Sequence, residues 1–185
     1  MVIGASAGAV DALGLLLPAV PAGARVPVIV VVHVPPNRPS LLPELFAQRC
    51  AAQVREPEDK EPARAGTIWL APSNYHLLVE RDRTFSLSVD EPVKFSRPSI
   101  DVLFESAVEA FGEKLCAIVL TGANDDAASG ARAVREAGGT VVVQDPETAE
   151  AEQMPKAAIK AANPQLIAAL PEIAEFLRLA TESAP

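Results

Sequence analysis

The chain has 185 residues, of which 49% are hydrophobic, and its formal net charge is −8. This length fits a single domain over residues 1–185 with a substantial core. Basic residues are scattered along the chain, so we expect no nucleic-acid partner. No apolar run has the length of a membrane span and no secretory signal is visible, so we predict no membrane insertion and a cytoplasmic location.

The first part of the chain alternates strand and helix patterns. A strand stub at residues 2–4 precedes a helix predicted at 7–17, and a long apolar strand follows at 26–33. A loop at 35–37 then leads into a helix predicted at 40–52. Continuous apolar strands of this kind are typical of parallel sheets that are covered on both faces.

Short apolar stretches separated by turn residues fill the segment from residue 53 to 89. Stretches at 67–70, 76–79 and 84–87 predict a small antiparallel meander, with a polar hairpin tip at 80–83. The meander is expected as an insertion in the surrounding α/β pattern.

Helical spacing returns at residues 100–111, where apolar residues recur on one face after Pro98 and Ser99. The remaining elements are strands predicted at 115–120, 140–144 and 165–170 and helices predicted at 127–137, 155–162 and 171–179. This alternation predicts a doubly wound, mostly parallel α/β sheet with helices on both faces.

A candidate nucleophile lies at the first strand-to-helix corner. Residues 4–8 read Gly-Ala-Ser-Ala-Gly, a G-x-S-x-G corner in which small neighbours permit a tight turn and leave Ser6 accessible. The first backbone N–H groups of the following helix point toward the same place, where an oxyanion would form.

A serine nucleophile needs a base, and the chain has only two histidines. Sites in open parallel sheets form beyond the carboxyl ends of strands, where His33 lies and His76 does not. We therefore predict His33 as the base and His76 as a structural residue. Asp125 and Asp126 follow another strand end, and either could accept the Nδ1–H of the imidazole. Spacing does not rank them, and Asp126 could also cap the helix that starts at 127.

Several stretches match one family in its order and cover most of the chain. They are residues 2–8, 32–35, 66–72, 76–79, 97–104, 119–122, 144–145 and 154–159. In these stretches the chain resembles the catalytic domain of the CheB-type chemotaxis protein-glutamate methylesterases. That family hydrolyses methyl esters of glutamate side chains on the cytoplasmic helices of chemoreceptors, and many members also deamidate receptor glutamines.

The resemblance implies roles for individual residues. Ser6 matches the nucleophile, His33 the base and Asp126 the acid of the family's triad. Backbone amides near Ala7 and Ala123 match the oxyanion hole. Neither a cofactor nor a metal is implied, and the two cysteines match no metal or disulfide motif. Many family members carry an N-terminal receiver domain; we expect none within this chain, so a separate receiver is a candidate regulator.

The chain departs from the family at two turns. Where the family reads Thr-Gly-Met-Gly-x-Asp-Gly, this chain has Ala123, Asn124 and Ala127 in place of Met, Gly and Gly. Asn tolerates a left-handed backbone better than Ala does. At residues 94–96 the family usually has Asn-Gly-His, and this chain has Lys-Phe-Ser. We expect these changes to bear on activity more than on the fold.

Two other functions stay open from sequence. The altered turn at 121–124 favours a non-catalytic module that binds receptor-like helices. The small-residue corner at 4–8 could also bind a phosphate at the start of its helix. A dinucleotide site is disfavoured, because the second strand ends in His33 and not in the acidic residue that would bind ribose.

Overall fold

A computed structural model describes residues 1–35 and 40–183 of the chain. The predicted loop at 35–37 lies largely outside the described residues. No helix among the described residues is both long enough and apolar enough to span a membrane.

A seven-stranded sheet forms the centre of the fold, in the order β3-β4-β2-β1-β7-β8-β9. Its strands are β1 (Val2–Ala5), β2 (Val28–Val32), β3 (Gln53–Arg55), β4 (Thr67–Leu70), β7 (Cys116–Val119), β8 (Thr140–Gln144) and β9 (Leu166–Ala168). All neighbouring strands pair in parallel, which confirms the predicted doubly wound sheet. The strand order reverses at β1, the position where open α/β sheets place their sites.

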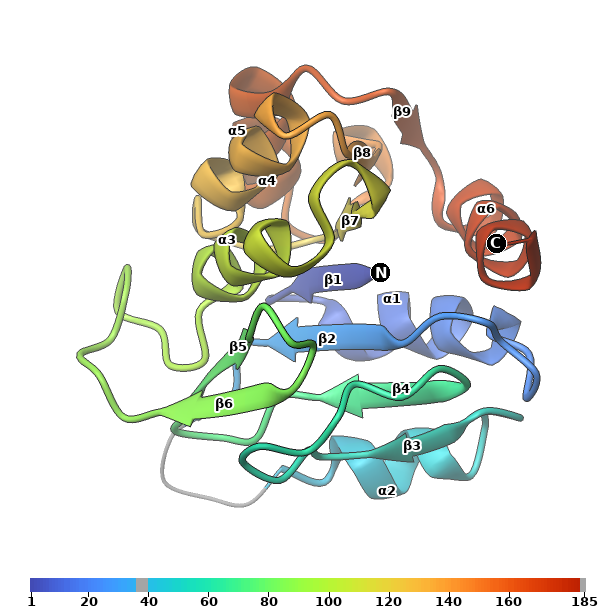
Figure 1. Cartoon of the computed structure of the whole chain (residues 1–185). Helices are drawn as coiled ribbons and strands as arrows, with labels where there is room; N and C mark the ends of the chain where they lie inside the picture. The colour runs from blue at the N-terminus through green and yellow to red at the C-terminus, as the bar shows by residue number, and fades with distance from the viewer. Residues whose placement is uncertain (36–39, 184–185) are drawn as a thin grey trace.

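Helices cover both faces of this sheet (Figure 1). The helices are α1 (Ala9–Leu16), α2 (Leu42–Ala47), α3 (Ile100–Phe111), α4 (Ala128–Glu136), α5 (Gln153–Ala162) and α6 (Leu170–Ser183), with short 3-10 turns at Leu17–Ala19, Gly112–Lys114 and Pro146–Thr148. Helices α3, α4 and α5 pack with Val2 of β1 in one core cluster. Helices α1, α2 and α6 pack with Ile3 in the other, because successive strand residues point to opposite faces.

One part of the predicted meander is wrong. Residues 67–70 form β4, which pairs in parallel with β2 through Val28 and Ile68 and belongs to the main sheet. Only β5 (His76–Val79) and β6 (Phe85–Ser88) form the antiparallel hairpin. Every residue of β4 is buried, as expected of a strand covered on both faces, and this pattern distinguishes it from the half-exposed β6.

Three strand ends meet at one edge of the sheet. Ala5 of β1 pairs with Val32 of β2, and the backbone N–H of His33 donates to the carbonyl of Ala5 at 3.3 Å. The N–H of Ser6 donates to the carbonyl of Thr121, just beyond β7, at 2.9 Å. Ser6 and His33 are therefore neighbours across the ends of adjacent strands.

Candidate active site

Ser6 sits on the corner between β1 and α1, as the sequence predicts. The corner needs glycine at position 8, where φ is +79° and an added Cβ would lie 2.8 Å from the Cβ of Glu150. Glycine at position 4 lets the side chain of Ile100 lie directly against the backbone of β1. The contact at Gly4 packs the first residue of α3 against β1, and the contact at Gly8 packs Glu150 against the corner that carries Ser6.

His33 is hydrogen-bonded to Asp126 and not to Asp125. The imidazole Nε2 lies 2.7 Å from Oδ2 of Asp126, whose side chain is fully buried, and the His33 side chain is 12% exposed. Asp125 lies at the surface and contacts Lys94 instead. The acid thus meets Nε2, and the expectation that it would accept Nδ1–H is wrong. Asp126 lies between the imidazole ring and the first residues of α3, and the spacing of residues in the sequence does not predict which ring nitrogen it meets.

Asp126 also caps a helix, although not the one expected from sequence. Its carboxylate accepts the backbone N–H of Ile100 at 2.7 Å, that of Asp101 at 3.0 Å and the Oγ–H of Ser99 at 3.0 Å. These groups form the start of α3, so the predicted cap on α4 is wrong. Burial opposes ionisation of Asp126, but the hydrogen bonds from His33 and from these amides outweigh it and lower the pKa of the carboxyl.

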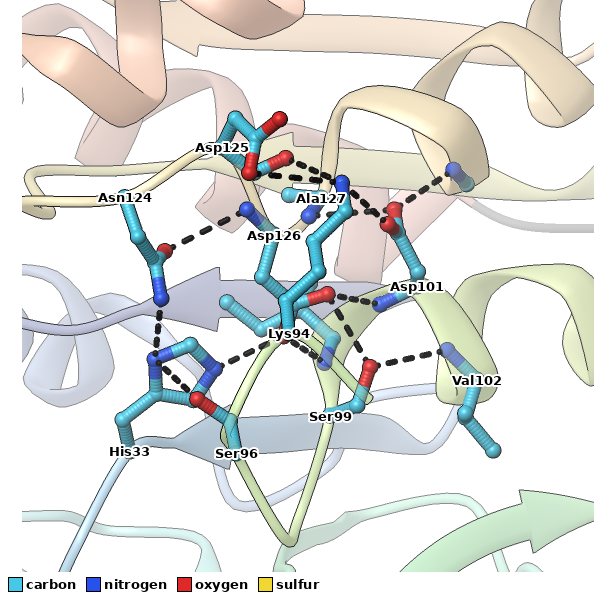
Figure 2. A network of polar contacts seen from close by, with 12 residues as sticks. His33, Lys94, Ser96, Ser99, Asp101, Val102, Asn124, Asp125, Asp126 and Ala127 are labelled. Atoms are coloured by element: carbon cyan, nitrogen blue, oxygen red, sulfur yellow. Dashed lines mark hydrogen bonds and ion pairs between the residues drawn. The ribbon is translucent and has the colours of Figure 1, made fainter. Parts of the chain in front are cut away.

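The cap on α4 comes from Asp101, in the first turn of α3 (Figure 2). Its Oδ1 accepts the N–H of Ala127 at 3.0 Å and that of Gly130 at 2.7 Å, and its Oδ2 lies 3.0 Å from Nζ of Lys94. The two helices therefore exchange caps: a residue before α4 caps α3, and a residue of α3 caps α4. Burial is the main cause that raises the pKa of Asp101, and nearby Asp126 adds to it.

Ala127 adopts a backbone conformation that favours glycine. Its φ is +104°, and the residue is completely buried between Asp126 and α4. A non-glycine residue in this region carries strain of about 1–3 kcal/mol. The hydrogen bond from the Ala127 N–H to Asp101 holds this turn in place, so Asp126 keeps its position despite the missing glycine.

The other nitrogen of His33 faces a pocket. Nδ1 lies 3.4 Å from Oγ of Ser96 and 3.4 Å from Nδ2 of Asn124 (Figure 2). The pocket beside it has a volume of about 430 Å³ and is lined by His33, Val34, Pro35, Asn74, Pro92, Phe95, Ser96 and Arg97. Within the described residues, no hydrogen bond joins the Ser6 hydroxyl to His33. Catalytic hydrogen bonds are often long in the absence of substrate, so this geometry does not remove Ser6 as a candidate.

A tight turn forms one wall of this pocket. Val93 and Ser96 exchange backbone hydrogen bonds, and Lys94 and Phe95 between them have φ of +49° and +63°. Two positive φ values define the turn type that prefers Asn-Gly, the pair the resemblance leads one to expect. Lys94 anchors this turn by donating from Nζ to the carbonyl of Asp125 at 2.8 Å, while Phe95 is fully exposed.

The two backbone groups expected at the oxyanion hole lie on the loops that follow β1 and β7. In the described part of the chain, the N–H groups of Ala7 and Ala123 have no hydrogen-bond partner. Thr121 joins the two loops, because its Oγ1 donates to the carbonyl of Ala7 at 2.8 Å while its N–H donates to Gln144. Within residues 1–35 and 40–183, Ala7 and Ala123 therefore keep unpaired N–H donors on the two loops that Thr121 joins.

His76 has a structural environment, as predicted. It is 2% exposed, its Nδ1 accepts the N–H of Ser99 at 3.2 Å, and its Nε2 lies 3.1 Å from the carbonyl of Glu91. The guanidinium of Arg97 also makes hydrogen bonds within the protein, because it donates to Asn74 and to the carbonyls of Val89 and Asp90. His76 thus ties Glu91 to the start of α3, and Arg97 ties the segment that carries Ser96 to Asn74.

Sequence reasoning missed several residues of this site. Ser96 and Asn124 beside Nδ1, and Ser99, Asp101 and Lys94 around Asp126, were given no role. A signal existed for two of them, because Ser99 stands at the N-cap of a strongly periodic helix and Asp101 in its first turn. For Asn124, the tendency of Asn to bond the backbone two residues on explains its contact with the Asp126 N–H. No local pattern indicates its contact with His33 or the contacts of Lys94, whose partners are remote.

Comparisons with known proteins point to a single family. A family profile described as CheB methylesterase matches residues 1–177. A Leptospira interrogans protein, provisionally named protein-glutamate methylesterase/protein-glutamine glutaminase, is 44% identical over 180 residues, which are 97% of this chain and 93% of that protein. A Symbiobacterium thermophilum protein named protein-glutamate methylesterase/protein-glutamine glutaminase is 35% identical over 160 residues, which are 86% of this chain but 44% of that longer protein.

A solved structure has the same fold. The crystal structure of the Thermotoga maritima CheB methylesterase catalytic domain superposes with a TM-score of 0.91 at 30% sequence identity, covering 96% of this chain and 95% of that one.

Proposed function

The chain belongs to the CheB methylesterase family, and we propose that it hydrolyses glutamate methyl esters on the cytoplasmic helices of chemoreceptors and deamidates receptor glutamines. The observation that carries this proposal is the pairing of His33 with the buried Asp126 at the strand end beside Ser6. A histidine that is oriented by a carboxylate next to an accessible serine is the arrangement used for acyl transfer. The proposal places this activity in the cytoplasm, where the receptor helices lie.

The proposed reaction begins when Nδ1 of His33 takes the proton of the Ser6 hydroxyl as Oγ attacks the glutamyl carbonyl carbon. The N–H groups of Ala7 and Ala123 stabilise the oxyanion of the tetrahedral intermediate. Nδ1–H then protonates the departing methoxide oxygen, and methanol leaves. Water hydrolyses the glutamyl ester of Ser6 by the same steps, which returns the free serine and a glutamate side chain.

Asp126 supports this reaction electrostatically. Its carboxylate contacts Nε2, so it stabilises the imidazolium that forms when Nδ1 takes the proton. The lowered pKa of Asp126 keeps this carboxylate ionised through the neutral pH range. Its bonds to the start of α3 hold it in place throughout the reaction.

The altered turn at 121–124 was the reason to consider a non-catalytic module. The turn retains Asp126 in contact with His33, and the N–H of Ala123 remains free in the described structure. We therefore do not propose that alternative. A separate receiver protein as regulator stays a prediction from the resemblance.

Methanol release from a methylated receptor fragment tests the proposal. Ser6→Ala should lower turnover on the order of 10⁴-fold or more and leave the unfolding curve unchanged. Labelling with a serine-directed phosphonate should place the adduct on Ser6 in wild type and in Ser96→Ala. This control is needed because Ser96 also lies near Nδ1. Unchanged methanol release by Ser6→Ala, or an adduct on Ser96, would show that the nucleophile is wrongly assigned.

A further inference from the structure

The amide side chain of Asn124 bridges the backbone of the acid and the ring of the base. Its Oδ1 accepts the backbone N–H of Asp126 at 3.2 Å, and its Nδ2 lies 3.4 Å from Nδ1 of His33 (Figure 2). The resemblance leads one to expect glycine at this position, so the bridge is made by a side chain that many relatives lack.

The direction of the amide follows from its partners. The N–H of Asp126 can only donate, so the atom facing it must be the carbonyl oxygen of Asn124. The amide –NH2 then faces Nδ1 of His33, and because –NH2 is also only a donor, Nδ1 must present its lone pair. The single ring proton of neutral His33 therefore lies on Nε2, where it donates to Oδ2 of Asp126.

Ser96 does not impose the same choice. Its Oγ is at the same distance of 3.4 Å from Nδ1, but a hydroxyl can either donate or accept. The Ser96 hydroxyl is therefore compatible with both an unprotonated and a protonated Nδ1. Of the two polar side chains that face Nδ1 among residues 1–35 and 40–183, Asn124 alone discriminates between a protonated and an unprotonated Nδ1.

We propose that Asn124 is a positioning residue that holds Nδ1 of His33 free of a proton and ready to accept one. The effect of Asn124 on catalysis rests on the proposed function. After Nδ1 takes the Ser6 proton, two donors face each other at this contact, so the contact favours passing that proton on to the departing methoxide oxygen. Asp126 favours the imidazolium and Asn124 disfavours it, so the two residues act on the ring in opposite directions.

Other charged groups lie on the segments that build this site and set the background for any pH dependence. They are Asp126 at Nε2, Asp101 and Lys94 beyond Asp126, Asp125 beside Lys94, Arg97 in the wall of the pocket, Glu105 on α3, which interacts with Asp101 and Asp126, and Glu150 next to Gly8. A test of Asn124 must therefore separate its donor from general changes in charge.

Imidazole ¹⁵N spectra measure the proton position directly. His33→Gln assigns the signals, because the chain has only one other histidine. In wild type, neutral His33 should carry its proton on Nε2. Asn124→Asp keeps an acceptor for the Asp126 N–H but puts a carboxylate opposite Nδ1, which stabilises the imidazolium, so the signals of the doubly protonated ring should persist to higher pH than in wild type. Asn124→Ser keeps an acceptor, loses the –NH2 and adds no charge. In this variant His33 should titrate between wild type and Asn124→Asp.

Matched controls separate this effect from its surroundings. Ser96→Ala removes the other neighbour of Nδ1 and should leave the proton on Nε2. Asp125→Asn changes a nearby charge without touching the ring, and should not move the proton either. A wild-type Nδ1–H tautomer, or an Asn124→Ser variant that titrates together with wild type, would overturn the inference.

The pH dependence of catalysis gives a second test that is independent of the spectra. The acid limb of the kcat/KM profile for methanol release should move to higher pH in the order wild type, Asn124→Ser, Asn124→Asp. If wild type releases no methanol while its spectra show the proton on Nε2, the proposed function fails and the positioning inference stands. Methanol release with an acid limb that does not move in Asn124→Asp would overturn the inference and leave the proposed function intact.

Discussion

The two nitrogens of His33 face regions of different character. At Nε2, a fully buried carboxylate is bound to the first amides of α3 and belongs to the exchanged caps of α3 and α4. At Nδ1, the neighbours in the described part of the chain are two side chains at 3.4 Å and a pocket bounded by an exposed turn. The contrast indicates that the ring is held rigidly at Nε2, while the surroundings of Nδ1, where we propose the proton transfer, are more open to rearrangement.

The largest effect on turnover is expected from Asp126, which holds the ring at Nε2. Asp126→Asn replaces a carboxylate oxygen by a donor and should lower kcat for methanol release by about 10⁴-fold. Asp125→Asn, one position earlier and exposed, should retain activity within about twofold. Equal losses in the two variants would contradict the assignment of Asp126, and steady-state kinetics at one pH decides between them.

Removing Asp101, which caps α4, is expected to lower the stability of the fold substantially. Asp101→Ala leaves the N–H groups of Ala127 and Gly130 without their acceptor and should lower the free energy of unfolding by about 2–3 kcal/mol. Urea unfolding measures this change. Asp125→Ala is the matched surface control and should stay within about 0.5 kcal/mol of wild type. A small loss for Asp101→Ala would show that the exchanged caps are not the source of rigidity.

A gain in stability is expected at Ala127. Glycine at φ +104° relieves backbone strain, so Ala127→Gly should raise the free energy of unfolding by about 1 kcal/mol. Ala128→Gly, in the first turn of α4, should lower it by about 0.5–1 kcal/mol. A loss of stability in both variants would mean that the Cβ of Ala127 contributes more through packing than the strain costs.

The smallest effect is expected in the acid dependence of stability. The pKa of Asp126 is lowered by folding, so its stabilisation is present above its ordinary value of 3.8 and is lost as the pH falls through the folded value. The gap in stability between wild type and Asp126→Asn should therefore narrow below pH 3.8. Asp101 is present in both variants, so the part of its raised pKa that burial causes cancels in this gap, and only the smaller part caused by Asp126 acts in the opposite direction. A gap that widens on acidification would reverse the assigned sign.

The sheet was predictable from sequence, because parallel strands buried on both faces read as continuous apolar runs such as β2 and β8. The boundary between sheet and hairpin was not, since β4 and β5 have similar apolar runs and only pairing separates them. Ser6, His33 and Asp126 were predictable as strand-end residues or by resemblance. The exchange of caps was not, because it joins positions about 25 residues apart through side chains, and neither partner stands at the N-cap of the helix it caps.

The double use of Asp126 has a consequence for interpreting other sequences of this kind. Because Asp126 closes the start of α3, a duplicated gene that no longer needed catalysis would still be selected to keep it. Ser6 makes no side-chain hydrogen bond within the described residues, so it could drift without harm to folding. Under the proposed mechanism, the serine is therefore the informative marker of a working enzyme among diverged copies, and the aspartate marks only an intact architecture.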